Sequence, residues 1–242
     1  MTLDPQRSTE AATLRKNLQE LVYRISHDLH EPLRGILGFS KLLLNESADA
    51  PFTEQQRRKY LQLINASSLR LQHQLAGLLT YSRVDSQARA HALVDMNVAL
   101  GSALAELNVQ TTYPGAVVHH DTLPTTTGDD QQLQSVLRAL IENALQYSEA
   151  PAWVHISGHT RDDHTLYSVQ DRGSGMPAQG LLKAFEPLVR LHPLTQNQAG
   201  MGLAVVKRII QRHGGHVWAE SSEGAGTTIH FTLPLSPAPN AP

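Results

Sequence analysis

The sequence predicts two domains: an all-α helical hairpin that dimerises into a four-helix bundle, then an α+β sandwich with helices on one face of a mixed sheet. Up to residue 86 apolar side chains recur at helical spacing, and near the start they are 4, 3 and 4 residues apart, as in a coiled-coil seam. Beyond residue 87, short helical patterns alternate with the period-two patterns of strands. We therefore assign 1–86 to the hairpin, 87–94 to a linker, 95–235 to the sandwich and 236–242 to a disordered tail.

Composition excludes several classes of protein. The chain of 242 residues has a formal net charge of -2, so it carries no basic field for nucleic acid. It contains no cysteine, which excludes disulfides, thiolate catalysis and cysteine-ligated zinc. No apolar run approaches the roughly 18 residues of a membrane helix, and the start lacks the apolar core of a signal peptide. We expect a cytoplasmic protein with no membrane segment.

The hairpin is predicted from two long amphipathic patterns. The first helix should run from about Thr9 to Glu46, with an interruption at Pro32, because a proline removes a backbone hydrogen bond and costs a helix interior roughly 3 kcal/mol. We interpret this proline as a hinge or a locally opened backbone. The second helix should begin at a capping box, 53–56, and end near Asp85.

Each of these helices carries one apolar stripe. A lone hairpin cannot bury both stripes, so two hairpins should pair into a four-helix bundle. The alternative is that the stripes pack against the downstream domain. The stripes comprise Leu18, Val22, Ile25, Leu29, Ile36, Phe39 and Leu43 on the first helix, and Leu61, Ile64, Leu71, Leu75 and Leu78 on the second.

His27 is the main candidate for chemistry in the hairpin. At about 100° per residue it lies about 200° from both Ile25 and Leu29, so the apolar pattern places it in solvent. An acid, Asp28, follows it directly. A histidine held beside an acid on a rigid helix suits a protein that brings a second body to the imidazole. The alternative is an ordinary surface histidine, since the chain contains 13 histidines.

The second domain is predicted to combine helices with a sheet. Helices are expected at about 98–107, 130–147 and 201–213, and strands at about 117–120, 152–159, 165–170, 215–220 and 227–233.

Two short signatures lie at the ends of these elements. Asn143 stands near a helix end, where its side-chain oxygen could ligate a hard cation, although asparagine there is often only a cap. Asp171, with Gly173 and Gly175, follows a strand. The acid could accept a hydrogen bond from the exocyclic amine of a purine, and glycines let the backbone approach a ligand. The alternative is an ordinary glycine-rich turn.

A third signature opens a helix. Gly200 and Gly202 stand where free backbone N–H groups make an anion site. The preceding loop, 185–198, is long enough to be a lid, and its Arg190 is a candidate phosphate contact. Each signature alone is weak, but their order and placement together indicate a nucleotide site.

With these motifs the chain resembles the sensor histidine kinases of two-component signalling over nearly its whole length. Residues 27–34 (HDLHEPLR) are similar to their H box, in the form common among phytochrome-type kinases. The hairpin resembles their dimerisation and histidine-phosphotransfer domain. The second domain resembles the Bergerat-fold ATP-binding domain that gyrase and the heat-shock chaperone ATPases share.

The resemblance implies roles for single residues in the nucleotide site. Asn143 falls on the magnesium ligand of the N box, and Tyr147 ends that box among the nucleotide-binding residues. Asp171, Gly173 and Gly175 fall on the adenine-binding glycine box.

Further along the chain, Phe185 opens the F box, and Gly200 and Gly202 fall on the second glycine box. Residues 224–228 (GAGTT) resemble the turn into the last strand of the family.

Several positions depart from the family pattern. Ala139 stands where the N box usually begins with Asn, and Gln146 where Lys or Arg is usual. Gln198 and Ala199 replace the usual start of the second glycine box, and Leu188 replaces the second aromatic of the F box. ATP binding is expected to survive these changes but to weaken.

The resemblance implies an ATP-dependent protein-histidine kinase. His27 Nε2 would accept the γ-phosphoryl group while Asp28 accepts a hydrogen bond from Nδ1–H, and Mg²⁺ held by Asn143 would neutralise charge. The group would pass to an aspartate on the receiver domain of a response regulator, for which Gly35 and Gly38 leave room. A homodimer and an upstream sensor domain are also implied.

Other functions of the same fold stay open. A phosphatase-biased protein or a catalytically weak signalling scaffold is the main alternative. Glu31 argues against phosphatase action, because kinases that also dephosphorylate their partner often have Thr or Asn four residues after the histidine. A simple ATPase is disfavoured, because Ala139 stands where such enzymes carry the carboxylate that activates water.

Overall fold

The chain forms two compact units, which divide between Ala76 and Gly77. The computed structural model describes residues 5–46, 51–161, 163–189 and 200–235, with side chains in the first helix described from Ile25 onward together with Tyr23. The predicted tail, 236–242, lies outside the described residues.

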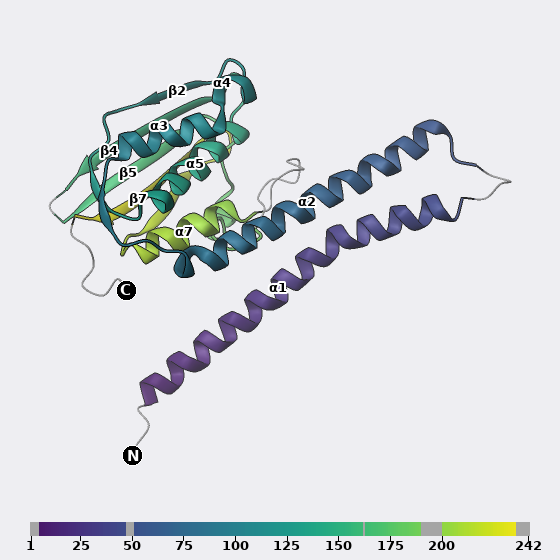
Figure 1. Ribbon diagram of the computed structural model, residues 1–242, viewed down its shortest axis with the longest axis horizontal. Helices are drawn as coiled ribbons and strands as arrows, with labels where there is room; N and C mark the ends of the chain where they lie inside the picture. The colour runs from purple at the N-terminus through teal and green to yellow at the C-terminus, as the bar shows by residue number, and fades with distance from the viewer. Residues whose placement is uncertain (1–4, 47–50, 162, 190–199, 236–242) are drawn as a thin grey trace. The chain divides into compact units, whose positions relative to one another are not determined.

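Two long helices dominate the N-terminal part of the chain (Figure 1), and the second of them continues past Ala76 into the second unit. Helix α1 spans Pro5–Leu44 and helix α2 spans Glu54–Ser86, close to the predicted ends. The predicted capping box is confirmed: Thr53 Oγ1 accepts from the amide of Gln56 at 3.2 Å, and Gln56 Oε1 accepts from the amide of Thr53 at 2.8 Å. This pair satisfies amides that the start of a helix leaves unpaired. Within the described residues, no helix is both long enough and apolar enough to span a bilayer.

The predicted interruption at Pro32 is wrong. Helix α1 continues through the proline without a break, and the proline is buried. The missing N–H removes one backbone hydrogen bond, and burial of the ring offsets part of that loss. His27 therefore lies on a continuous helix.

Side-chain contacts hold α1 and α2 in one antiparallel register. The ring of Phe39 stacks on that of Tyr60, with centroids 5.8 Å apart. Closer to His27, the guanidinium of Arg70 pairs with the carboxylate of Glu31. The residue further along α1 contacts the residue that comes earlier in α2. This order is the one that two antiparallel helices require.

The two glycines after His27 differ in the space around them. A Cβ on Gly35 would lie 3.0 Å from Ser67 Oγ, so this glycine lets α2 approach. A Cβ on Gly38 would meet no described atom within 4 Å. The expected room for a partner is therefore wrong for Gly35, where α2 fills the space, whereas Gly38 has open space beside it.

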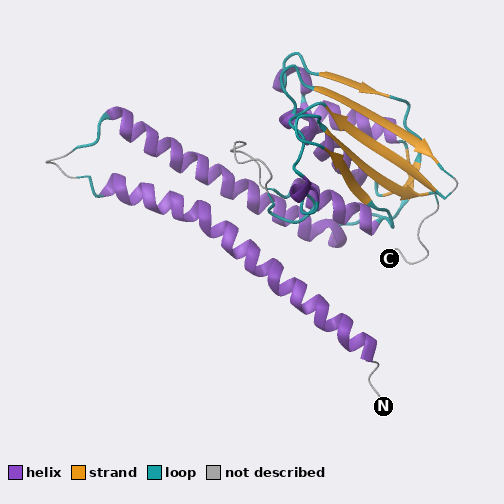
Figure 2. Cartoon of the chain, turned by 180° about the vertical axis from the view of Figure 1, so that it is seen from behind, coloured by secondary structure: helices purple, strands orange, loops and turns teal. Residues whose placement is uncertain are grey.

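A mixed sheet forms the centre of the second unit, with the strand order β2-β4-β5-β7-β6. Strand β2 is parallel to β4, and the other neighbouring strands are antiparallel. Helices α3, α5 and α7 cover one face of the sheet, and Figure 2 looks onto the other face. The strands of this sheet are β2 (Val117–His120), β4 (Trp153–Thr160), β5 (His164–Asp171), β6 (Val217–Ser221) and β7 (Thr227–Pro234), and the helices are α3 (Met96–Leu107), α5 (Asp130–Tyr147) and α7 (Gly202–Arg212).

These elements confirm the predicted α+β architecture, with ends within two residues of those expected. Four short elements were not predicted: strands β1 (Ala92–Val94) and β3 (Thr126–Gly128), which pair with each other, and helices α4 (Val109–Thr112) and α6 (Ala178–Leu181). The linker assigned to 87–94 is therefore wrong where β1 lies. Elements of three or four residues are too short to show a helical or strand periodicity, so the sequence pattern could not predict these four.

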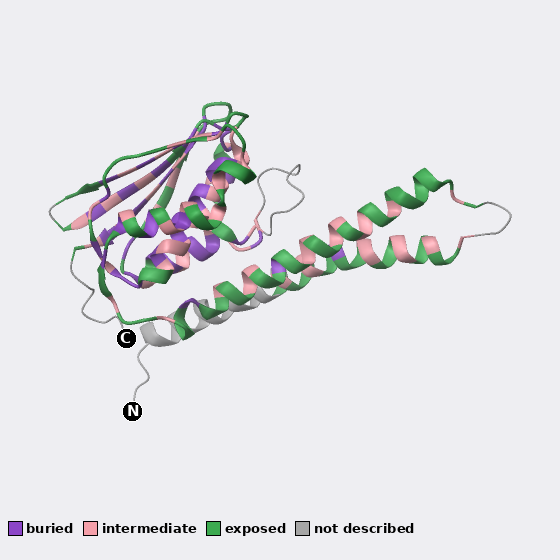
Figure 3. Cartoon of the chain, turned by 45° about the horizontal axis from the view of Figure 1, so that its top comes forward, coloured by how far each residue is buried: buried purple, intermediate pink, exposed green. Residues whose placement is uncertain are grey.

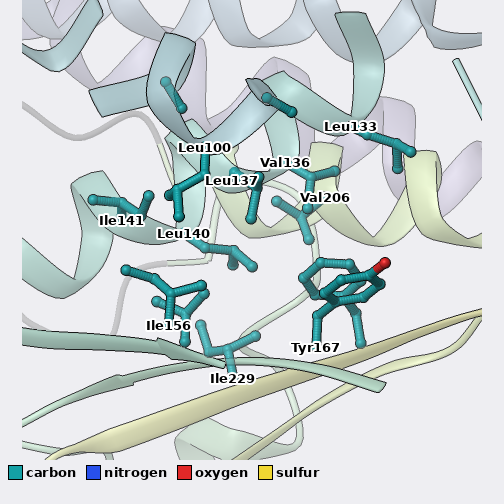
Figure 4. Packing of buried hydrophobic residues seen from close by; sticks show 14 of the residues in the cluster. Leu100, Leu133, Val136, Leu137, Leu140, Ile141, Ile156, Tyr167, Val206 and Ile229 are labelled. Atoms are coloured by element: carbon teal, nitrogen blue, oxygen red, sulfur yellow. The ribbon is translucent and has the colours of Figure 1, made fainter. Parts of the chain in front are cut away.

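The core lies between the sheet and the helices, where buried residues gather in Figure 3. Leu133, Leu137 and Leu140 of α5 point from the helix side, and Ile156 and Tyr167 point from the strands (Figure 4). Each fully buried apolar side chain contributes about 1.5–3 kcal/mol.

A buried histidine joins the end of α7 to the start of α5. His213 Nδ1 donates to the carbonyl of Ile209 at 2.8 Å, and Nε2 accepts from the amide of Asp129 at 3.0 Å. The ring is satisfied as the neutral form, because a proton on Nε2 would face another N–H. Burial lowers the pKa of His213, the hydrogen bond to Ile209 opposes that shift, and the nearby charges of His91 and Arg212 lower the pKa further.

We predict that the free energy of unfolding falls as the pH drops below about 6.5, because the unfolded chain then protonates His213 and the folded chain does not. The slope contributed by this residue can reach about 1.4 kcal/mol per pH unit. Denaturant unfolding between about pH 7.5 and pH 5.5 measures it. His213→Gln should flatten the slope, and the exposed control His159→Gln should keep it; equal slopes in both variants would contradict the assignment.

Candidate functional site

His27 and Asp28 form a pair on the surface of α1. The side chain of His27 is 61% exposed, that of Asp28 is 29% exposed, and His27 Nδ1 lies 3.1 Å from Asp28 Oδ1. An ionised carboxylate only accepts hydrogen bonds, so Nδ1 carries the proton and Nε2 keeps its lone pair. The pair therefore presents an imidazole whose Nε2 can act as a nucleophile or bind a proton.

Glu31, one turn beyond His27, is held by Arg70 of α2. The guanidinium makes two hydrogen bonds to the carboxylate, of 3.1 Å and 2.5 Å, one to each oxygen. This two-point geometry fixes the direction of the carboxylate. The Glu31 side chain is 55% exposed, so the ion pair contributes at most about 1 kcal/mol to stability. Its main consequence is that both oxygens of Glu31 are engaged.

In the second unit, the C-terminal end of α5 meets the loop that follows β5. The amide of Ser174 donates to the carbonyl of Tyr147 at 3.2 Å, and Ser148 forms a bridge with Gly173. A Cβ on Gly173 would lie 2.2 Å from the carbonyl oxygen of Tyr147, so only glycine fits there. The structure thus brings Tyr147 and Gly173 together.

Asp171 ends β5 and is buried. Its Oδ1 accepts from the amide of Gly173 at 2.8 Å and from the amide of Thr227 at 3.1 Å. Burial raises the pKa of Asp171, and the two amide hydrogen bonds oppose that rise. Among the described residues no hydrogen bond reaches Oδ2, so this oxygen can accept one from a ligand.

Two glycines pack the β5–α6 loop against the turn between β6 and β7. Gly175 has a φ of +67°, and a Cβ there would lie 2.0 Å from the carbonyl oxygen of Ser222. Gly226 has a φ of +81°, and its Cβ would lie 2.3 Å from the carbonyl oxygen of Asp171. At both glycines, two backbone segments near Asp171 are therefore in direct contact, which a side chain would prevent.

The start of α7 completes this site. Gly200 has a φ of +67°, and its carbonyl accepts from the amide of Leu188 at 2.8 Å. Gly202, the first residue of α7, is exposed, and a Cβ there would lie 3.8 Å from Nδ2 of Asn143. The residue before it, Met201, caps the helix without a side-chain hydrogen bond. The first amides of α7 can therefore bind an anion beside Asn143.

The structure thus brings the predicted residues of the second unit into one site, apart from Arg190, which lies outside the described residues. The site suits a purine nucleotide: Asp171 offers an acceptor for an exocyclic amine, and the N-terminus of α7 suits its phosphates. Asn143 carries an amide oxygen, which is a type of ligand that Mg²⁺ accepts, and proteins usually hold this ion through few side chains and the phosphates of a nucleotide.

Sequence reasoning missed two residues of this site. Thr227 donates its amide to Asp171, and the hydroxyl of Ser221 lies 3.0 Å from that of Thr227. Thr227 stands inside the GAGTT motif, which pointed to the turn but not to this side chain. No sequence signal marks Ser221, because its contact with Met176 spans 45 residues and its other contacts depend on the pairing of β6 with β7.

Two family models match the chain. The model described as His Kinase A (phospho-acceptor) domain matches residues 17–87, which include His27. The model described as Histidine kinase-, DNA gyrase B-, and HSP90-like ATPase matches residues 128–237, which include Asn143 and Asp171.

Relatives of similar sequence include two phytochromes. Cyanobacterial phytochrome A of Nostoc sp. is 34% identical over 220 residues, covering 90% of this chain and 28% of the relative. Phytochrome-like protein Cph1 of Synechocystis sp. is 29% identical over 239 residues, covering 95% of this chain and 32% of the relative. The chain therefore spans less than a third of the length of either relative.

Solved structures share the fold. The histidine kinase ThkA in complex with the response regulator protein TrrA gives a TM-score of 0.69 at 18% identity, covering 99% of this chain and 69% of that chain. Full-length ShkA in complex with AMPPNP gives a TM-score of 0.58 at 25% identity, covering 93% and 47% respectively.

We predict that Gly226→Ala lowers the free energy of unfolding by about 2–4 kcal/mol, because the new methyl group meets backbone and the left-handed φ disfavours alanine. Gly101→Ala is the matched control. A Cβ on Gly101 would meet no described atom within 4 Å, and alanine stabilises a helix interior by up to about 1 kcal/mol relative to glycine. Chemical denaturation compares the two, and equal stabilities would contradict the tight packing at Gly226.

Proposed function

Because the chain belongs to the sensor histidine kinases, we propose that it is an ATP-dependent protein-histidine kinase, which phosphorylates His27 and transfers the phosphoryl group to an aspartate of a response regulator. The observation that carries the proposal is the His27–Asp28 pair, an exposed imidazole whose Nδ1 faces a carboxylate. It lies in the segment that matches the phospho-acceptor domain.

The pair explains how a neutral histidine becomes a nucleophile. With Nδ1–H bound to Asp28, the lone pair of His27 Nε2 attacks the γ-phosphorus of ATP, and the bond from that phosphorus to the β,γ-bridging oxygen breaks. ADP leaves with the electron pair of that bond. Positive charge that develops on the imidazole is stabilised by Asp28, which holds the ring in the required tautomer.

The nucleotide site supports ATP as the phosphoryl donor. Oδ2 of Asp171 accepts a hydrogen bond from the exocyclic amine of adenine. The free backbone N–H groups at the N-terminus of α7, at Gly202, bind phosphate oxygens. Tyr147, Gly173, Gly175 and Gly200 shape the walls around the nucleotide. When bound, Mg²⁺ neutralises negative charge on the phosphates, and Asn143 is the side chain that would ligate it.

A response regulator is the proposed acceptor of the phosphoryl group. The solved complex of ThkA with TrrA supports this class of partner. On this chain, Gly38 leaves open space on α1 beyond His27. A partner that carries an aspartate can approach the imidazole because the His27 side chain is itself exposed, and Gly38 offers open helix surface about three turns further along. The upstream sensor domain stays a prediction.

A homodimer through the hairpin is the second part of the proposal. Apolar side chains on both helices remain exposed: Leu33 at 41%, Leu37 at 51% and Leu44 at 83% on α1, and Leu61 at 55% and Leu75 at 46% on α2. The predicted stripe residues Ile36, Phe39, Ile64 and Leu71 are half-buried between the helices instead. A second hairpin would cover the exposed stripe, and each Å² of apolar surface buried gains about 25 cal/mol.

Net kinase action is favoured over phosphatase action by the pairing of Glu31 with Arg70. Water-mediated dephosphorylation of a partner needs a side chain near the histidine that orients water. Both carboxylate oxygens of Glu31 bind the guanidinium of Arg70, so this side chain is committed to another contact.

We predict that His27→Gln abolishes the incorporation of acid-labile label from γ-labelled ATP, because Nε2 of the imidazole is the attacking atom. His30→Gln is the matched control, since His30 is also exposed on α1 and its Nδ1 already binds the carbonyl of Ser26 at 2.6 Å. The control should incorporate label at close to the wild-type rate, and both variants should bind ATP. Label that persists in His27→Gln would overturn the nucleophile assignment.

We predict that Leu37→Glu combined with Leu61→Glu converts the dimer into a monomer, because four buried glutamates per bundle would lose their hydration. Helix content should be kept, since both positions are exposed within one hairpin. Light scattering at micromolar concentration measures the mass, and circular dichroism measures the helix content. The polar control, Lys41→Glu with Gln62→Glu, should stay dimeric; a wild-type protein that is monomeric would refute the bundle.

A further inference from the structure

The hydroxyl of Ser221 joins the two loops that enclose Asp171. Ser221 lies at the end of β6. Its Oγ accepts from the amide of Met176 at 2.8 Å and donates to the carbonyl of Gly226 at 2.7 Å. The third neighbour of the same atom is the hydroxyl oxygen of Thr227, at 3.0 Å.

These contacts determine which way the hydroxyl of Thr227 points. A serine hydroxyl has one proton and two acceptor positions. The proton of Ser221 is used on the carbonyl of Gly226, and one acceptor position is used by Met176. The remaining position can only accept, so the hydroxyl of Thr227 must be the donor. Oγ1 of Thr227 is left with acceptor capacity alone.

Thr227 and Asp171 lie side by side on the helix-covered face of the sheet. The register of β5 and β7 pairs Gln170 with Thr228, so the next pair along is Asp171 with Thr227. Both are buried, and along β7 Thr227 alternates in step with the core residue Ile229. The amide of Thr227 also donates to Asp171. The two side chains therefore face the same space at the end of the sheet.

From this geometry we infer that Ser221 is a positioning residue that sets the selectivity of the site for a purine with an amino group at position 6. The inference rests on the proposed binding of ATP at Asp171. With Thr227 turned toward Ser221, the pocket presents only acceptors, Oδ2 of Asp171 and Oγ1 of Thr227. An amino group offers two N–H donors to such a pair, directly or through one water.

A 6-oxo purine meets this pocket differently. Hypoxanthine has a carbonyl at position 6, and its oxygen would face the lone pairs of Thr227. Without the hydroxyl of Ser221, the proton of Thr227 is released and can turn toward that carbonyl. One hydrogen bond exchanged for one repulsive contact is worth roughly a tenfold change in relative affinity.

The test compares the dissociation constants of ATP and inosine triphosphate, which lacks the 6-amino group, by calorimetry on the full chain with Mg²⁺ at about pH 8. Wild-type protein should prefer ATP. Ser221→Ala should lower that preference by roughly tenfold, mainly by tighter binding of inosine triphosphate. The matched control is Ser168→Ala, which removes a serine hydroxyl on β5 that is hydrogen-bonded to Nδ1 of His230 on the neighbouring strand β7. This variant should keep the wild-type preference.

A double-mutant cycle shows whether Ser221 acts through Thr227. Thr227→Val should also reduce the preference, and adding Ser221→Ala to Thr227→Val should change it no further. A wild-type preference in Ser221→Ala, or effects of the two substitutions that simply add, would overturn the inference. If Ser221→Ala does not fold, Ser221→Cys carries the same prediction, because a thiol is a weak donor and acceptor. Wild-type protein that binds neither nucleotide would instead overturn the proposed function.

Discussion

The carboxylate of Asp171 is the interaction on which the nucleotide site depends. Its Oδ1 accepts two backbone hydrogen bonds. One comes from the amide of Gly173, two residues along the chain, and the other from the amide of Thr227, on the adjacent strand. One oxygen atom thus ties a glycine-rich loop to the start of β7. A buried carboxylate needs such partners, since an unpaired charge in the interior is costly. The two amides leave Oδ2 to a ligand.

The glycines around this carboxylate follow from the same constraint. Loops on both sides must come within backbone contact of β5 if their amides are to reach one oxygen. A Cβ at Gly175 or Gly226 would stand about where a carbonyl oxygen already lies. A side chain at either place would push a loop outward and break the hydrogen bonds to Asp171. These glycines therefore help to position Asp171 by allowing close backbone packing around it.

The hairpin differs from this site, because it leaves the ring of His27 exposed rather than buried. Helix α1 keeps His27 in solvent and supplies Asp28 from the next position, so the acid–base pair needs no tertiary contact. One turn away, tertiary contact does matter: Glu31 is directed by Arg70 from α2. The His27–Asp28 pair is thus set by local sequence, and its surroundings are set by the packing of two helices.

The sequence by itself determined the features that depend on local periodicity. Helical spacing predicted both long helices and the exposure of His27, and period-two alternation predicted the strands of the large sheet, because these patterns extend over many residues. The capping box at Thr53 was readable since both of its partners lie within one turn. The glycine motifs pointed to the nucleotide site because family resemblance ties those spacings to a known fold.

Only the tertiary structure decided what depends on residues distant in the chain. Pro32 was expected to interrupt α1, yet the helix continues through it, and the proline is buried in packing that no local pattern reveals. Strands β1 and β3 were missed because each is too short to show a period and exists through pairing with the other. Ser221 carries no motif, and its three contacts come from residues 176, 226 and 227. Hydrogen bonds of this kind are fixed by where the chain folds back on itself, which is why spacing along the sequence cannot predict them.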